Sequence, residues 1–190
     1  MPVKTSSPAY KRDRIQGENT LAELPWCGKI LLRGDPSNSR LVRKASSVLG
    51  ADLPADPNTL TQGSDRTVYW MGPNEWLIHC AMDDVTDLVA KLRDALDGIH
   101  HAIVDVSDYY TVLELKGPDA AALLSRGCPM DLHAEAFVPG TCAQTRFGHA
   151  SILLHRNSET EFKIQVRWSY TEYVWDYIES ATAGLKAPAE

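Results

Sequence analysis

An apolar run, a tight glycine turn and an amphipathic segment occur twice along the chain in the same order. The first copy covers residues 30–49 and the second residues 113–126. Their turns read Gly34-Asp35-Pro36 and Gly117-Pro118-Asp119, and each segment is followed by a further glycine. Proline near the first turn of a helix and glycine just past its last turn are typical boundaries. The sequence therefore predicts a strand, a turn and a helix in each half of the chain.

Each half continues with a predicted hairpin and a closing helix. The hairpins surround the turn residues Gly72-Pro73-Asn74 and Asn157-Ser158. The closing helices begin after Asp84, a candidate cap, and after Ser169, which forms a capping box with Glu172. Because matching elements lie about 83–87 residues apart, the sequence indicates that one strand–helix–hairpin–helix unit is duplicated. Chance similarity between two α+β halves is the alternative.

Two further strands are predicted between the halves. Residues 102–106 and 110–113 are largely apolar and are joined at Ser107 and Asp108. Strands that return by hairpins form an antiparallel sheet with helices on one face, so the predicted class is α+β with an internally duplicated antiparallel sheet. Residues 53–67 form the longest segment without predicted structure, and loops of such length are often functional.

The domain organisation follows from these elements. We expect a polar N-terminal arm at residues 1–24 and a short C-terminal tail at residues 184–190. Between them, residues 25–183 are expected to form a single domain made of two pseudo-repeats, at about 28–98 and 102–183.

Composition and charge exclude several classes of protein. The 190 residues carry 19 Lys and Arg against 25 Asp and Glu, and the formal charge of −6 opposes binding to nucleic acid. No apolar run approaches the roughly 18–20 residues that cross a bilayer, and the first residues lack the apolar core of a secretory signal. The basic cluster Lys11, Arg12 and Arg14 predicts a solvated or partner-bound arm. With four widely spaced cysteines that suit a reducing compartment, we expect a cytoplasmic protein without nucleic-acid or membrane partners.

The common catalytic patterns are missing from the sequence. It contains no glycine-rich phosphate loop, no nucleophile elbow, no HExxH and no paired Cys/His spacing for a metal. Asp105 and Asp108 are the best candidates for acid–base chemistry, but a structural interpretation is favoured because such side chains bond nearby backbone amides in turns. We therefore predict no catalytic, cofactor-binding or metal site on this chain.

The last predicted helix carries a tryptophan in an unusual position. Its apolar stripe is predicted to centre on Tyr170 and Tyr177, which places Trp175 about 130° away among polar side chains. Such an indole must stay exposed to water, be covered by another segment or anchor a partner. Because Trp is enriched among interface hot spots, we predict that Trp175 is an interface anchor, with cover inside the chain as the alternative.

The chain has several distinctive blocks between Trp26 and Ile178: the segments 68–78 and 126–133, then Phe137, Pro139-Gly140, Cys142-Ala143-Gln144-Thr145, Arg167, Ser169-Tyr170 and Trp175-Asp176. Together these blocks resemble the gamma subunit family of heterotetrameric sarcosine oxidase. Asp105-Val106-Ser107 and Gly117-Pro118-Asp119-Ala120 are similar to folate-binding domains of the glycine-cleavage T-protein type, which are internally duplicated α+β domains. The resemblance therefore implies the same fold that the repeat predicts.

The resemblance to the T-protein type fails at one position. That family implies an aspartate for folate-linked chemistry on the next strand pair, whereas this sequence has no Asp or Glu between Glu135 and Glu159. One-carbon transfer from an amine requires a positioned group that handles protons at the amine. The resemblance therefore implies the fold and the partners, and not a catalytic site.

Taken together, the resemblance implies a non-catalytic gamma subunit. Its complex would oxidatively demethylate sarcosine to glycine and transfer the one-carbon unit to tetrahydrofolate, with FAD, FMN, NAD and tetrahydrofolate on the other subunits. The alpha subunit is the expected main partner, and beta and delta subunits belong to the same complex. The interface candidates are Trp175, Trp76, Tyr109 and Arg146. The alternative is an independent folate-binding or one-carbon-transfer protein.

Overall fold

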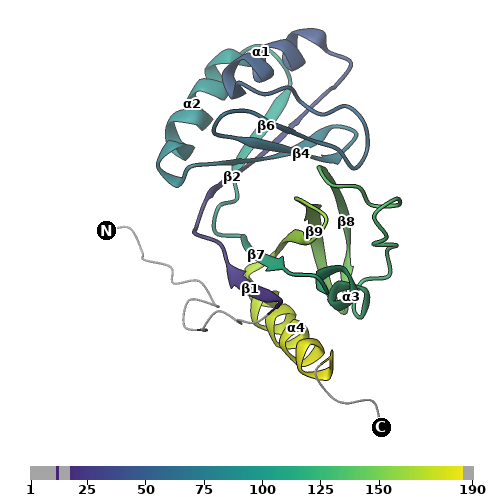
Figure 1. The fold of residues 1–190 in the computed structure, drawn as a ribbon. Helices are drawn as coiled ribbons and strands as arrows, with labels where there is room; N and C mark the ends of the chain where they lie inside the picture. The colour runs from purple at the N-terminus through teal and green to yellow at the C-terminus, as the bar shows by residue number, and fades with distance from the viewer. Residues whose placement is uncertain (1–11, 13–17, 186–190) are drawn as a thin grey trace. The chain divides into compact units, whose positions relative to one another are not determined.

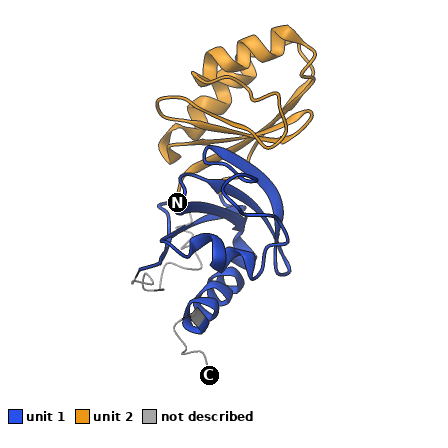
Figure 2. Ribbon diagram, turned by 45° about the vertical axis from the view of Figure 1, so that its right-hand side comes forward, with its two compact units in different colours: residues 1–25, 108–190 blue, residues 26–107 orange. Residues whose placement is uncertain are grey.

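The computed structural model describes residue 12 and residues 18–185 (Figure 1). Most of the expected arm, including Lys11 and Arg14, and most of the expected tail lie outside the described residues. The chain divides into two compact units, coloured separately in Figure 2. Unit 1 contains residues 1–25 and 108–190, and unit 2 contains residues 26–107.

Unit 2 is a five-stranded antiparallel sheet with two helices. In chain order its elements are β2 (Gly28–Gly34), α1 (Ser39–Leu49), β3 (Leu60–Gln62), β4 (Thr67–Gly72), β5 (Glu75–Cys80), the 3₁₀ turn η1 (Met82–Asp84), α2 (Val85–Ala95) and β6 (His101–Asp105). The strand order is β3-β4-β5-β2-β6. Figure 1 shows α1 and α2 together on one side of these strands.

Unit 1 has the same composition of elements. They are β1 (Thr20–Glu23), β7 (Tyr110–Lys116), α3 (Ala120–Ser125), β8 (Thr141–Phe147), β9 (Ala150–Arg156), β10 (Glu161–Arg167), the 3₁₀ turn η2 (Trp168–Tyr170) and α4 (Thr171–Leu185). The strand order is β1-β7-β10-β9-β8, and every pair is antiparallel. Within the described residues, none of the helices is both long enough and apolar enough to cross a bilayer.

The two sheets match strand by strand, which confirms the predicted duplicated α+β fold. Ile30 pairs with Ile78 at the centre of unit 2, as Leu113 pairs with Ile164 at the centre of unit 1. The edge strand differs in origin between the copies. In unit 2, the strand beside β2 is β6, the last element of that unit. In unit 1, the strand beside β7 is β1, which comes before all of unit 2 in the chain. Unit 2 is therefore inserted between β1 and β7 of unit 1.

This exchange of edge strands corrects one expectation. Residues 102–106 and 110–113 do form strands, but β6 and β7 belong to different sheets and do not pair with each other. The amide of Val106 donates to Lys29 O at 2.8 Å, and the amide of Lys29 donates to Ser107 Oγ at 3.0 Å. The chain therefore follows β2 as far as Ser107 before it enters unit 1.

Strand alternation directs apolar side chains toward the helices in each unit. In unit 1, Leu113, Ile164 and Leu154 are buried against α3 and α4, while Val174 and Ile178 face them from α4. Unit 2 repeats the arrangement with side chains from β2, β4 and β5 packed against α1 and α2. Full burial of one such aliphatic side chain contributes about 1.5–3 kcal/mol, so these faces supply most of the stability of each unit.

The helix boundaries are only partly as predicted. Gly50 follows the end of α1 with φ 63°, as the sequence predicts. The start of α1 is capped by Asn38, which was not predicted and whose side chain accepts from the amides of Arg40 and Leu41. The predicted cap at Asp84 and the predicted capping box at Ser169 are wrong, because no side chain caps either closing helix. Instead, the 3₁₀ turns η1 and η2 lead directly into α2 and α4 and satisfy the first helical amides through the backbone.

The segment 53–67 also differs from its expected form. It contains the short strand β3, whose Thr61 pairs with Val68 of β4. The indole N–H of Trp76 donates to Pro54 O at 2.9 Å and fixes the start of the segment. β3 has only three residues, which is too short a segment for alternation of apolar and polar side chains to predict a strand. Its extended conformation is therefore determined by pairing with β4.

A buried arginine holds the irregular segment between α3 and β8. The guanidinium of Arg156 donates to the backbone oxygens of Leu132, Phe137 and Glu159 at 3.0, 2.8 and 2.9 Å. It also lies over the ring of Phe162 at 5.2 Å. Because the backbone carbonyls replace a carboxylate, the planar, many-donor shape of arginine is essential at this position.

We predict that Arg156→Lys lowers the free energy of unfolding by about 2–4 kcal/mol, because one ammonium cannot reach all these carbonyls. Urea unfolding followed by circular dichroism measures the change. Arg146→Lys is the matched control, since Arg146 is exposed and its replacement leaves stability nearly unchanged. Equal stability of the two variants would show that Arg156 does not hold the segment.

Candidate interaction surface

Neither candidate for acid–base chemistry, Asp105 or Asp108, lies in a paired acid–base arrangement with a described residue. Asp105 accepts from both the amide and the hydroxyl of Ser107, at 3.0 and 2.6 Å, a contact of the kind that the sequence predicted for Asp108. Asp108 is exposed at the start of unit 1. Across residues 18–185, no three His, Cys, Asp or Glu side chains are grouped so that they could hold a metal ion.

None of the four cysteines, all of which lie in the described part of the chain, forms a disulfide. Cys80, Cys128 and Cys142 are buried, and burial raises the pKa of the Cys80 thiol to about 11. A thiol with a raised pKa carries almost no thiolate at neutral pH, so Cys80 behaves as a small apolar side chain.

The predicted orientation of the last helix is wrong. The buried side of α4 consists of Thr171, Val174, Trp175, Ile178 and Ala181. Trp175 is only 2% exposed and belongs to the core of unit 1, so its indole is covered inside the chain, the alternative that the sequence left open. The tyrosines misled the prediction because Tyr177 lies at the margin of the stripe and Tyr170 lies in η2, before α4 begins.

The second tryptophan candidate is buried too. Trp76 is 2% exposed in the core of unit 2, and its indole N–H is already bonded to Pro54 O. Neither Trp76 nor Trp175 is therefore available at the surface of the chain.

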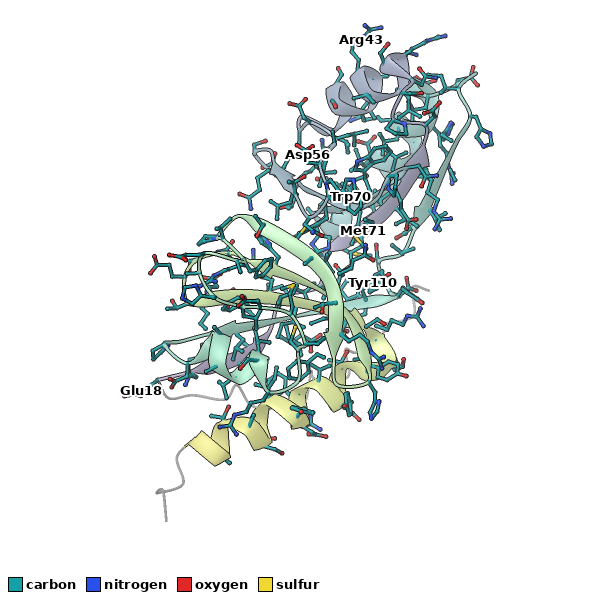
Figure 3. All side chains as sticks on the ribbon, turned by 90° about the vertical axis from the view of Figure 1, so that its right-hand side faces the viewer. Glu18, Arg43, Asp56, Trp70, Met71 and Tyr110 are labelled. Atoms are coloured by element: carbon teal, nitrogen blue, oxygen red, sulfur yellow. The ribbon has the colours of Figure 1, made fainter. Side chains whose placement is uncertain are left out.

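The other two candidates, Tyr109 and Arg146, lie at the same end of the sheet of unit 1. Tyr110 pairs with Arg167, and Arg146 pairs with Ser151. Val166 of β10 pairs with Ile152 of β9. Because the two strands are antiparallel, the next residue of β10, Arg167, lies opposite the preceding residue of β9, Ser151. Tyr110, Arg167, Ser151 and Arg146 thus form one row across β7, β10, β9 and β8, on the face opposite the helices; we call it the arginine row. Figure 3 labels Tyr110 at its start.

Exposed aromatic side chains adjoin this row. Tyr109, Trp168 and Tyr170, which we call the aromatic patch, are 45%, 40% and 39% exposed. The amide of Trp168 donates to Tyr109 O at 3.0 Å, and the guanidinium of Arg167 lies 5.3 Å from the centre of the Tyr109 ring. The structure therefore places the aromatic patch and the arginine row side by side.

The sequence indicated Tyr109 and Arg146 but missed Arg167, Trp168 and Tyr170. Trp168 directly follows β10, and the sequence predicts Tyr170 at the centre of the stripe of a helix. Both fall in η2, where neither periodicity applies. The only local signal for Trp168 and Tyr170 is that the alternation of the strand ends before them and the helical spacing of apolar residues begins after them.

The hairpin of β8 and β9 carries no carboxylate. Its side chains on the face opposite the helices are Cys142, Gln144, Arg146, Ser151, Leu153 and His155. Burial lowers the pKa of His155 to about 4; the charge of Lys163 lowers it further and that of Glu161 opposes the shift. At neutral pH this imidazole is uncharged, so on the face opposite the helices the hairpin carries positive charge only at Arg146.

Open grooves elsewhere on the two units lack paired acid–base groups. A groove of about 650 Å³ beside α4 is lined by Arg126, Tyr173, Asp176, Tyr177, Ser180 and Ala181. Its tyrosine hydroxyls are engaged, since Tyr177 donates to Arg126 O at 2.9 Å and Tyr173 accepts from the amide of His149 at 3.2 Å. The groove along α1 in unit 2 is lined mainly by hydroxyl and amide side chains. The strongest candidate site of the described chain is therefore the aromatic patch with the arginine row.

Comparisons with known proteins point to one family. The model of the sarcosine oxidase, gamma subunit family matches residues 33–184. Sarcosine oxidase subunit gamma of Corynebacterium sp. (strain U-96) is 29% identical over 189 residues, which are 98% of this chain and 91% of that relative. A chain of the heterotetrameric sarcosine oxidase from Corynebacterium sp. U-96, solved with pyrrole 2-carboxylate, superposes with a TM-score of 0.88 at 28% identity and covers 98% of both chains.

A more distant structure shares the fold alone. The glycine cleavage system aminomethyltransferase T from Bartonella henselae superposes with a TM-score of 0.62 at 14% identity. The match covers 83% of this chain and 44% of that one. The predicted likeness to the T-protein fold is thereby confirmed.

We predict that Trp175→Ala lowers the free energy of unfolding by about 3–5 kcal/mol, because it leaves a large cavity in the core of unit 1. Trp168→Ala, at an exposed position, changes it by no more than about 0.5 kcal/mol. Chemical denaturation of both variants measures the two values. A stable Trp175→Ala variant would contradict the burial of the indole.

Burial of His155 predicts a loss of stability in mild acid. The unfolded imidazole takes up a proton as the pH falls below about 6.5, whereas the folded one resists until about 4. Protonation of His155 in the unfolded chain lowers the free energy of unfolding by about 2 kcal/mol between pH 7 and pH 5, and this loss levels off below the pKa of the folded state. Unfolding free energies of wild type and His155→Gln at both pH values isolate it, with exposed His149→Gln as control. Equal pH dependence of wild type and His155→Gln would refute the assignment.

Proposed function

Since the chain belongs to the sarcosine oxidase gamma subunit family, we propose that it is a non-catalytic subunit that supports assembly of a heterotetrameric sarcosine oxidase. The observation that carries this proposal is the aromatic patch with the adjacent arginine row. Exposed Tyr, Trp and Arg side chains are enriched where proteins meet and are uncommon as a group on a monomer surface. The chain thus contributes contact area to the complex.

The chemistry of the complex resides on the other subunits in this proposal. These subunits hold FAD, FMN, NAD and tetrahydrofolate, demethylate sarcosine to glycine and pass the one-carbon unit to the folate. Support comes from the hairpin of β8 and β9, which has no carboxylate to exchange a proton with an amine. Asp105, the nearest candidate along the chain, has one carboxylate oxygen engaged by Ser107.

We place the chain against the alpha subunit as its main partner, with beta and delta subunits in the same complex. The exposed rings of the aromatic patch suit an obligate contact, in which apolar and aromatic area is buried permanently. The location of this complex in the proposal is the cytoplasm, whose reducing conditions suit four cysteines that form no disulfide in the described structure.

The proposal predicts two results. First, co-expression of the other three subunits without this chain gives little assembled complex, and adding the chain restores assembly and sarcosine-dependent peroxide production. Second, the purified chain neither oxidises sarcosine nor binds tetrahydrofolate. Native mass spectrometry measures assembly, and calorimetric titration measures folate binding. Saturable binding near micromolar by the isolated chain would instead support an independent folate-binding or one-carbon-transfer protein.

A further inference from the structure

The two arginines of the arginine row have no acidic partner within the described chain. Arg146 and Arg167 are exposed, and neither makes an ion pair with any described residue. Two other cations on the sheets meet carboxylates, whereas Lys29, Arg156 and Lys163 make no ion pair with a described residue. Arg33 meets Glu75 at 2.6 Å, and Lys116 meets Glu114 and Glu161 at 3.0 and 3.3 Å. Among the unpaired cations of the two sheets, Arg146 and Arg167 are exposed while the others are buried or half-buried, which sets this end of the sheet apart.

The charge balance of the whole chain strengthens the contrast. Acidic side chains outnumber basic ones by 25 to 19, yet the hairpin of β8 and β9 contains none. The exposed neighbours of Arg146 on the same face of this hairpin, Gln144 and Ser151, are uncharged. The arginine row is thus a local basic surface on an acidic protein, and such a surface attracts an acidic partner.

The geometry of the row defines what it can bind. Arg146 and Arg167 are two strands apart on one face, so their stems are separated by about 10 Å. Each guanidinium can bind one carboxylate through two parallel hydrogen bonds. The Tyr109 ring beneath Arg167 limits the orientations of that guanidinium and reduces the entropy lost on binding.

We propose that Arg146 and Arg167 bind two carboxylates on another subunit of the complex, while Tyr109 and Trp168 pack against apolar surface beside them. This inference rests on the proposed function and adds the chemistry of the partner: an acidic segment whose carboxylates are spaced to reach both arginines. Pairing with arginine sets the register of the contact, and aromatic burial supplies most of its affinity.

The test is co-expression of all four subunits with an affinity tag on the alpha subunit. The chain is supplied as wild type, as the Arg146→Glu, Arg167→Glu variant, or as the Arg40→Glu, Arg43→Glu variant. The last is a matched control, because it makes the same charge change on exposed positions of α1; Figure 3 labels Arg43 there. The amount of chain retained per alpha subunit is measured during washes of rising ionic strength.

The proposal predicts that reversal in the arginine row lowers retention roughly tenfold or more, whereas the control is retained like wild type. Arg146→Gln, Arg167→Gln keeps the size and polarity of the side chains, and its retention falls less and depends less on salt. Thermal melting of each purified chain verifies folding, and the Gln pair replaces the Glu pair if the latter melts early.

Three outcomes overturn the inference. Retention of the reversed or Gln variant at the wild-type level means that the arginines do not contact another subunit, while the proposed function stands. A wild-type homodimer in solution that the reversal abolishes assigns the arginine row to a second copy of this chain. Failure of the wild-type chain to be retained at all refutes the proposed function as well.

Discussion

The register of the two central strand pairs determines the rest of the molecule. Ile30 opposite Ile78 and Leu113 opposite Ile164 place every second side chain of β2, β5, β7 and β10 under the helices. A slip by one residue would exchange the two faces, expose the apolar set and bury charges such as Arg167. Because burial of these aliphatic side chains outweighs any surface contact, the register is fixed by the core, and the positions of the surface residues follow from it.

The arginine row is a direct consequence of this register. Its members come from four strands and occur at 110, 146, 151 and 167 in the sequence, so no local pattern connects them. They share one row only because β10 pairs with both β7 and β9, while β8 continues the sheet. The core thus brings two distant arginines onto one face without any interaction between them.

The same distinction explains what the sequence could predict. The two predicted hairpins, most strands and the glycine that ends α1 depend on neighbouring residues, and their patterns gave correct predictions. The position of Trp175, the edge strands and β3 depend on partners elsewhere in the fold, and these were missed or misassigned. In the candidate site, Tyr109 and Arg146 were identified individually, but their neighbours Arg167 and Trp168 required the pairing of β8, β9 and β10.

The duplication itself separates scaffold from recognition. Both copies end their last hairpin strand in a 3₁₀ turn that leads into the closing helix: Met82–Asp84 in unit 2 and Trp168–Tyr170 in unit 1. The residue before the turn is Ala81 in one copy and Arg167 in the other. Since the backbone is the same and the side chains are acidic in one turn and aromatic in the other, the fold cannot be the source of specificity. What distinguishes unit 1 is the pair of exposed aromatic side chains, Trp168 and Tyr170, that this shared turn carries.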